Sequence, residues 1–351
     1  MSGKVTIIEV AQAADVSPST VSNLLNGRDE KMRPATRDRI WRAIDELGYR
    51  PNTAARQLKT GHTPIIGLIV PSVANPFYGV FAQHVEQVAL SHGYQVLLGN
   101  SEREPEREKT YAEELWNYGV RGLIFGSSLE EISHLTALID SGLHLVAFDR
   151  PAQATDAVAI DSIGIDNVQA ARMAVKHLVA LGHRRIGFLS GPIRTISRRE
   201  RLDGYRSALA EAGLSIEEGL VWEGVPSTRY GDAEAFELGR QGAQELLSFS
   251  NPPTAIFTIN DIYAFGTYAG ARDMGVHIPS DLSIVGFDDI ALTQVVDPPL
   301  TTVRQPIAQV ARAAVERLIG RLEGSFTGPC DHQTLSSQLI VRGSTTRMQD
   351  S

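Results

Sequence analysis

The chain has 351 residues, of which 42% are hydrophobic and 21% charged, and it carries 33 Lys and Arg against 41 Asp and Glu. At about 150 residues per domain, this length predicts two domains with sizeable cores and excludes a single small module. The composition excludes a disordered or collagen-like chain. The net charge of −8, taken alone, argues against a protein that binds nucleic acid.

Cysteine content and hydropathy predict a soluble, cytoplasmic protein. Cys330 is the only cysteine, which excludes an intrachain disulfide and a zinc site made of several thiolates. Glu9 and Gln12 interrupt the first apolar stretch before it reaches the length of a signal peptide. The densest apolar run, residues 65–70, is far shorter than the roughly 20 residues that span a bilayer.

Charge is divided unevenly along the chain. Residues 1–62 contain ten Lys and Arg and seven Asp and Glu, a net charge of +3, whereas the remainder contains 23 and 34, a net charge of −11. This division permits a small basic head that contacts DNA, joined to an acidic body. A solvated helix surface with basic side chains is the alternative that charge alone leaves open.

The first part of the chain has the pattern of a helix-turn-helix. Apolar residues between positions 6 and 26 fit two short helices separated by a turn at residues 14–16. Ser17 is suited to cap the second helix, and Pro18 to occupy its first turn. The apolar positions of this pair are Ile7, Val10, Ala11, Ala14, Val16, Val21 and Leu24.

A third helix is expected from about Pro34 to Gly48, which ends it. Its inner stripe is expected to consist of Ile40, Ala43, Ile44 and Leu47. The second helix carries small polar side chains on its outer face, as a helix that enters the major groove requires. Because any surface helix has a polar face, this feature alone does not decide between DNA binding and plain packing.

Residues 5–27 (VTIIEVAQAADVSPSTVSNLLNG), followed by TRDRI at 36–40 and ELGYRPN at 46–52, resemble the head of the lactose/galactose repressor family. The resemblance implies base-reading positions at Pro18, Ser19 and Asn23. It implies phosphate contacts at Thr6, Ser17, Thr20, Ser22 and Asn26. The family more often has Arg or His at position 23, and Asn favours adenine over guanine. The loop at 27–35 is about two residues longer than is usual in the family.

Residues 52–60 contain good helix formers, but a helix of about nine residues is marginal on its own. The resemblance implies a hinge that folds when two copies pack together in the minor groove. Leu58 would then wedge into a central base step, and Ala55 and Lys59 would make neighbouring contacts. A flexible linker with an incidental leucine is the alternative.

From residue 65 onward, short apolar runs alternate with helical stretches, which is typical of parallel α/β sheets. The expected strands are 65–70, 95–99, 122–125, 145–148, 185–190, 255–258 and 282–287. The clearest helices are expected at 168–181, 201–212 and 261–274.

A weak internal sequence similarity suggests that this body has two halves, because LVAFD at 145–149 resembles SIVGFD at 283–288. Asp149 and Asp288 each lie at the carboxyl end of an expected strand, where open α/β sheets bind ligands. Two facing halves would present both carboxylates across one cleft. The alternative is that each Asp merely caps a turn.

The same family resemblance covers the body, through motifs such as FDRP at 148–151, RLDGY at 201–205 and GFDD at 286–289. It implies a periplasmic-binding-protein-like body of two interleaved Rossmann-like subdomains. The implied effector contacts are Phe77, Tyr78, Asp149, Arg201, Tyr230, Asn260 and Asp288. These side chains suit a sugar, since they hydrogen-bond hydroxyls or stack on an apolar face. Arg198 and Arg199 would suit an acidic or phosphorylated ligand, but we interpret them as surface arginines.

No sequence signature of catalysis is present among the usual nucleotide, P-loop, nucleophile-elbow and zinc motifs. His177 and His183 are six residues apart, which does not favour a metal site. We expect no enzyme, cofactor or metal. An exported sugar-binding protein would share the body but have no use for the head, and a sugar enzyme would need a catalytic constellation.

The sequence therefore predicts a ligand-responsive transcriptional regulator, most simply a repressor. Residues 1–50 are expected to form the helix-turn-helix domain, 51–62 the hinge, and 63–351 the effector-binding and dimerisation domain. Two heads of a homodimer would read a pseudo-palindromic operator on double-stranded DNA. The seven residues after Ser344 leave no room for a tetramer-forming helix, so we expect a dimer.

Overall fold

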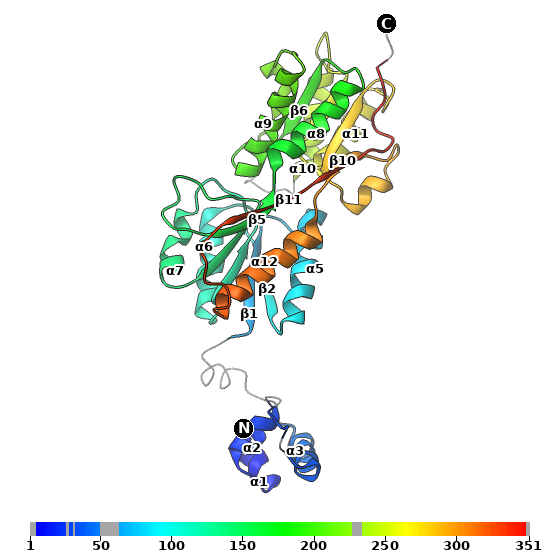
Figure 1. Cartoon of the computed structure of the whole chain (residues 1–351). Helices are drawn as coiled ribbons and strands as arrows, with labels where there is room; N and C mark the ends of the chain where they lie inside the picture. Colours follow the sequence, from blue (N-terminus) through cyan, green and yellow to red (C-terminus); the bar gives the residue numbers. More distant parts are fainter. Residues whose placement is uncertain (1–4, 26–27, 31, 50–62, 227–233, 349–351) are drawn as a thin grey trace. The chain divides into compact units, whose positions relative to one another are not determined.

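The computed structural model describes residues 5–25, 28–30, 32–49, 63–226 and 234–348. It divides into two compact units, with the boundary between Thr63 and Pro64 (Figure 1). Each unit has its own hydrophobic core. Within the described part of the chain, no helix has both the length and the apolar character needed to cross a membrane.

The first unit is a bundle of three short helices. They are α1 (Ile7–Ala13), α2 (Pro18–Leu25) and α3 (Pro34–Leu47). Val10, Val21 and Ile40, one from each helix, are fully buried against one another. Gly48 ends α3 with a φ of +61°, a left-handed conformation that favours glycine. One expectation is wrong: Leu47 is 37% exposed and does not belong to the core, against which Tyr49 packs instead.

The second unit contains two six-stranded sheets. All strands of the first sheet are parallel. In spatial order they are β11 (His332–Leu335), β5 (Asp161–Ile165), β4 (His144–Phe148), β3 (Gly122–Phe125), β1 (Ile65–Val70) and β2 (Gln95–Asn100). One face packs on α5 (Pro76–Ser91) and α12 (Ile307–Leu322). The other face packs on α6 (Pro105–Asn117), η1 (Ser133–Leu135) and α7 (Thr136–Asp140).

The second sheet repeats this plan with one antiparallel edge, where β12 pairs with β10. Its order is β12 (Gln338–Ile340), β10 (Thr301–Arg304), β9 (Ser283–Asp288), β8 (Ala255–Thr258), β6 (Ile186–Ser190) and β7 (Val221–Glu223). Helix α8 (Asn167–Ala180) packs on α9 (Ile196–Glu211), and α10 (Ala235–Leu247) on α11 (Asp261–Asp273). The short 3-10 helices η2 (Glu218–Leu220) and η4 (Ala291–Gln294) lie in connecting segments.

The chain passes between the two sheets three times, from β5 to α8, from β10 to α12 and from β11 to β12 (Figure 1). The two subdomains are therefore interleaved along the chain. Strands β4 and β9 are each the fourth strand counted from the edges β2 and β7. The sequence similarity between residues 145–149 and 283–288 thus reflects equivalent strand positions in the two subdomains.

All seven apolar runs expected to be strands are strands, with ends that differ by one residue at most. Five strands were not expected: β5, β7, β10, β11 and β12. Helix α9 begins at Ile196, five residues before the expected start at Arg201. The reason is a local cap, because Thr195 Oγ1 accepts a hydrogen bond from the Arg198 N–H at 3.3 Å.

Candidate functional site

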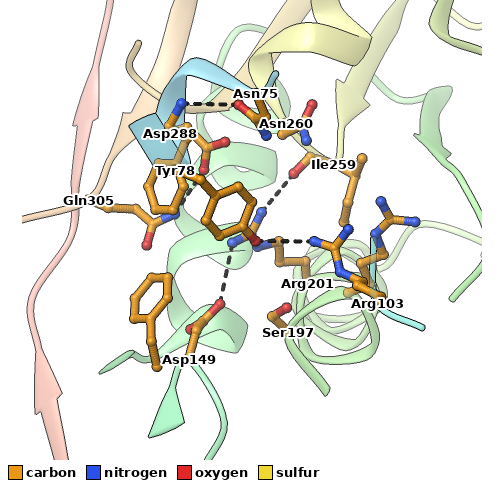
Figure 2. A pocket seen from close by; sticks show the side chains of 13 residues that line it. Asn75, Tyr78, Arg103, Asp149, Ser197, Arg201, Ile259, Asn260, Asp288 and Gln305 are labelled. Atoms are coloured by element: carbon orange, nitrogen blue, oxygen red, sulfur yellow. Dashed lines mark hydrogen bonds and ion pairs between the residues drawn. The ribbon is translucent and has the colours of Figure 1, made fainter. Parts of the chain in front are cut away.

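A small cavity lies between the carboxyl ends of the two sheets and is partly open to solvent (Figure 2); the space in it that can hold water is about 30 Å³. Its wall carries charged, amide and aromatic side chains from both subdomains. The lining residues are Asn75, Phe77, Tyr78, Arg103, Phe148, Asp149, Ser197, Arg198, Arg201, Ile259, Asn260, Asp288 and Gln305.

Asp149 follows β4 and is buried against Arg201 and Asn167. Asn167 Nδ2 donates to Asp149 Oδ1 at 2.7 Å, and Arg201 Nη2 lies 3.7 Å from Asp149 Oδ2. Burial raises the pKa of Asp149, whereas the Arg201 charge and the Asn167 hydrogen bond oppose that rise. The backbone φ of Asp149 is +56°, a left-handed conformation in which Asp is tolerated.

Arg201 is fixed by contacts in several directions and is only 7% exposed. Its Nε donates to Asn167 Oδ1 at 2.9 Å, and its Nη1 donates to the Ile259 carbonyl at 2.8 Å. The guanidinium also lies 3.6 Å from the centroid of the Phe287 ring. A preorganised fork of this kind presents its donors without a large entropic cost.

Asp288 ends β9 of the second subdomain, whereas Asp149 belongs to the first, and Gln305 Nε2 donates to Asp288 Oδ1 at 2.8 Å. The neighbouring Asp261 is fully enclosed, and burial followed by the Asp288 charge raises its pKa. Asp289 turns away from the cavity to pair with Arg342 at 2.6 Å. Of the two consecutive aspartates, only Asp288 therefore lines the cavity.

Aromatic rings form the apolar part of the wall. The Phe77 and Phe148 rings stack with centroids 6.0 Å apart, and Tyr78 meets Phe77 edge to face at 5.2 Å. Arg103 Nη2 donates to the Tyr78 hydroxyl at 3.1 Å, as Figure 2 shows. Asn260 caps α11, since its Oδ1 accepts from two backbone N–H groups. Its side-chain amide is left to face the cavity as a donor.

The structure brings together most of the effector contacts that the resemblance implied. The cavity wall contains Phe77, Tyr78, Asp149, Arg201, Asn260 and Asp288. Tyr230 lies outside the described residues. Reasoning from the sequence missed Asn75, Arg103, Phe148, Ser197, Ile259 and Gln305 as lining residues.

The interpretation of Arg198 as a surface residue is wrong. Arg198 lines the cavity and is 7% exposed, whereas Arg199 is exposed and pairs with Glu130 at 2.7 Å. The Thr195 cap is the signal that would have revealed this, because a helix beginning at 196 turns Arg198 and Arg201 to the same side. Arg103 and Gln305 lie in irregular segments after β2 and β10 and carry no comparable signal.

On the head, the first turn of α2 presents a cluster of hydroxyl groups. Ser17 Oγ accepts from the Thr20 N–H at 3.2 Å and lies 2.7 Å from Ser19 Oγ. Ser17, Pro18, Ser19 and Asn23 are exposed, and Thr20 and Ser22 are half-buried. All six implied contacts therefore keep at least part of their side chains accessible.

Thr6, the other described member of the implied DNA-contact set, caps α1. Its N–H and hydroxyl both donate to Glu9, at 2.7 and 2.9 Å, and these bonds lower the pKa of the Glu9 carboxyl. Asn26, Ala55, Leu58 and Lys59 lie outside the described residues.

His177 and His183, the two histidines considered as possible metal ligands, make structural hydrogen bonds. His177 Nε2 contacts Thr345 Oγ1 at 3.0 Å, and His183 contacts Thr254 and Ser283 at 2.9 and 3.0 Å. Burial lowers the pKa of both imidazoles. Over the described ranges, no group of three or more His, Cys, Asp or Glu side chains is arranged to hold a metal ion.

Comparison with known proteins identifies the family of this chain. Residues 6–52 match the family model of bacterial regulatory proteins, lacI family, and residues 175–345 match a periplasmic binding protein-like domain. The transcriptional regulator DegA of Bacillus subtilis (strain 168) is 35% identical over 342 residues, which cover 97% of this chain and 98% of DegA. The chain belongs to the lacI family of bacterial regulatory proteins.

Other members resemble this lacI-family regulator along nearly their whole length. The transcriptional repressor CytR of Escherichia coli (strain K12) is 34% identical over 347 residues, 97% of this chain and 96% of CytR. The structure of the lac repressor dimer bound to operator and the anti-inducer ONPF matches with a TM-score of 0.83 and 28% identity, over 97% and 99% of the two chains. A complex of the regulator CelR with cellobiose matches with a TM-score of 0.72 and 30% identity, over 97% and 99%.

Proposed function

We propose that this regulator is a ligand-responsive repressor that binds a pseudo-palindromic operator as a homodimer. Residues 1–50 would read DNA, 51–62 would form the hinge, and 63–351 would bind the effector and dimerise. The observation that carries the proposal is the combination, in one lacI-family chain, of a polar α2 on the head and a two-sided polar cavity in the body. We place this activity in the cytoplasm, where bacterial DNA lies.

On the DNA side, we assign base reading to Pro18, Ser19 and Asn23 at the start of α2. The hydroxyl groups and small side chains of this face support the proposal, because they allow backbone and side-chain donors to approach base edges and phosphates. The phosphate contacts proposed are Thr6, Ser17, Thr20, Ser22 and Asn26. Ala55, Leu58 and Lys59 are assigned to the minor groove at the operator centre.

On the effector side, we assign the cavity to a small polyhydroxylated molecule, a sugar or sugar derivative. Two carboxylates, an arginine and an amide surround the space, and aromatic rings supply an apolar face. The assigned contacts are Phe77, Tyr78, Asp149, Arg201, Tyr230, Asn260 and Asp288. The buried Arg198 widens the class to acidic and phosphorylated sugars. Binding accounts for these residues without a reaction or a cofactor.

The proposed switch couples the cavity to the hinge. The effector contacts both subdomains, so its binding favours one of their relative arrangements over the other. A shift of the first subdomains in the dimer would change whether two hinge segments fold together on DNA. By reciprocity, operator binding alters the affinity for effector by the same factor by which the effector alters the affinity for the operator.

The DNA assignment is tested by selecting duplexes from a random pool with the full-length protein. We expect an enriched pseudo-palindrome, and the Leu58→Ala variant should lose affinity for it much more than for unrelated duplex, because only the specific complex is kinked. Affinity should fall steeply with salt, since the acidic body leaves DNA contact to the heads. Equal losses on both duplexes would contradict the hinge assignment.

The effector assignment is tested by thermal shift with D-galactose, D-ribose, cellobiose, D-gluconate, D-glucose 6-phosphate and cytidine. A compound that binds the folded state at 100 times its Kd adds about 2.7 kcal/mol of stability. Asp288→Ala should abolish the shift, whereas Arg199→Ala, an exposed variant on α9, should keep it. A compound that stabilises the Asp288→Ala variant as well as the wild type would refute the assignment of the cavity.

A further inference from the structure

Asn167 joins three charged side chains behind the cavity wall. Its Nδ2 donates to Asp149 Oδ1 at 2.7 Å and to Glu200 Oε2 at 3.3 Å, and its Oδ1 accepts from Arg201 Nε at 2.9 Å. Asn167 is 1% exposed and begins α8 of the second subdomain, whereas Asp149 follows β4 of the first. One amide therefore links an acid of one subdomain to an acid and an arginine of the other.

Glu200 is the member of this cluster that the proposed function leaves unexplained. It does not line the cavity, and it is half-buried on α9 beside Arg201. Two carboxylates thus accept hydrogen bonds from one amide nitrogen, and together with Arg201 the cluster carries a net charge of −1 when both are ionised. Burial, and next the charge of Asp149, raise the pKa of Glu200 from 4.5 to about 7.

We propose that Glu200 is a proton-responsive positioning residue of the effector cleft. When neutral, it leaves Asn167 and Arg201 to orient Asp149; when ionised, it draws the Asn167 amide toward itself and adds a second negative charge to the cluster. The coupling follows from geometry, because the two N–H groups of one amide nitrogen donate to the two carboxylates, and the hydrogen bond to an ionised acceptor is the stronger one. The inference deepens the proposed function and rests on it, since it concerns regulation of the same cleft.

The charged groups around Glu200 determine the direction of the effect. Asp149 and Asp166 favour its protonated form, and Arg201 favours its ionised form. On the far side of Asp149, His332 of β11 has a pKa lowered by burial, so it adds little positive charge near neutral pH. Ionisation of Glu200 therefore adds negative charge next to an acid that already shares its partners, and effector affinity should fall as the pH rises through 7.

The first test needs no effector and compares urea unfolding of the full chain between pH 5 and 8.5. A folded-state pKa above the unfolded value means that the folded state binds more protons, so stability falls as pH rises from about 4.5 to 7. Relative to Glu200→Gln, which resembles the neutral acid, wild type should lose roughly tenfold in its folded-to-unfolded ratio across this window, after allowance for solvent screening. Asp203→Asn, an exposed acid on the same helix, should parallel wild type.

A third variant tests whether the titration belongs to the cleft. Because the Asp149 charge raises the pKa of Glu200, Asp149→Asn should move the pH-dependent loss of stability to lower pH. Parallel pH profiles for wild type and Glu200→Gln would overturn the inference. A profile that does not move in the Asp149→Asn background would also overturn it, because Glu200 would then titrate independently of the cleft.

The second test measures binding of the compounds of the thermal-shift panel at pH 6 and pH 8. For a compound that binds, the Kd of the wild type should rise about threefold to tenfold between these values, whereas that of Glu200→Gln should stay constant. Equal pH dependence in both proteins would overturn the positioning role and leave the effector assignment intact. If no panel compound binds, the effector assignment fails, and the urea profiles still decide whether Glu200 responds to protons as inferred.

Discussion

Replacing Arg201 by Ala should destabilise the body of this regulator strongly. The substitution removes the donors to Asn167 Oδ1 and the Ile259 carbonyl and the charge beside Asp149. Breaking a buried ion pair by deleting one partner costs about 3–5 kcal/mol, because the remaining charge is left uncompensated. The exposed Arg199–Glu130 pair is the matched control, and Arg199→Ala should cost less than about 1 kcal/mol.

The pH dependence separates this cause from simple loss of packing. Burial already raises the pKa of Asp149, and removal of the Arg201 charge raises it further. In the variant, the folded-state pKa of Asp149 lies further above its unfolded-state pKa than in the wild type. The variant therefore loses more stability as the pH rises from the unfolded-state pKa to the folded-state pKa. The cost of Arg201→Ala should therefore be smaller at pH 5 than at pH 7.5.

Urea unfolding of the full chain, followed by circular dichroism at both pH values, measures these differences. Adding Asp149→Asn to Arg201→Ala should recover about 1–3 kcal/mol, because the amide removes the unpaired buried charge. A cost below 1 kcal/mol for Arg201→Ala, or the absence of recovery in the double variant, would refute the reasoning. The result also bears on effector assays, since a lost response in Arg201→Ala cannot be separated from partial unfolding.

Three further predictions concern packing, capping and charge. Gly266→Ala should lower the free energy of unfolding in urea by about 3 kcal/mol, because the added Cβ would lie 2.0 Å from the Phe236 carbonyl oxygen. The control Gly79→Ala, whose Cβ would have no atom within 4 Å, should be neutral or stabilising. Equal effects of the two substitutions would contradict the packing argument. Ser17→Ala should speed hydrogen exchange of α2 amides about fivefold, as expected for loss of about 1 kcal/mol of capping, and unchanged exchange would argue against the cap. Asp288→Asn should leave stability at pH 7 unchanged or higher, because it removes a charge that raises the pKa of Asp261; a loss above about 2 kcal/mol would speak against this.

Local signals in the sequence were sufficient for the head and for the central strands. The start of α2 follows from a capping serine and a proline in the first turn, and the end of α3 from Gly48, all of which act within a few residues. Six of the seven expected strands are continuous apolar runs because both of their faces are covered, whereas the seventh, β2, is a mostly exposed edge strand. The net charge of the whole chain was misleading, since the +3 head and the −11 body cancel in part.

The edge strands and part of the site depended on contacts that no local pattern records. Strands β11 and β12 have exposed or half-buried residues and form because a neighbouring strand completes their hydrogen bonds. Gln305 reaches the cavity because the chain leaves β10 beside Asp288 on its way to the other subdomain.

By itself, the sequence determined the family, the three-helix head, the positions of seven strands along the chain and the two carboxylates that line the cavity. Only the tertiary structure decided that Arg198 is buried, that Gln305 supports Asp288, and that Asn167 joins Asp149 to Glu200. The physical reason is distance along the chain. Caps and hydrophobic periods act between near neighbours, whereas Asp149 and Glu200 are 51 positions apart and affect each other's protonation only after two sheets fold around them.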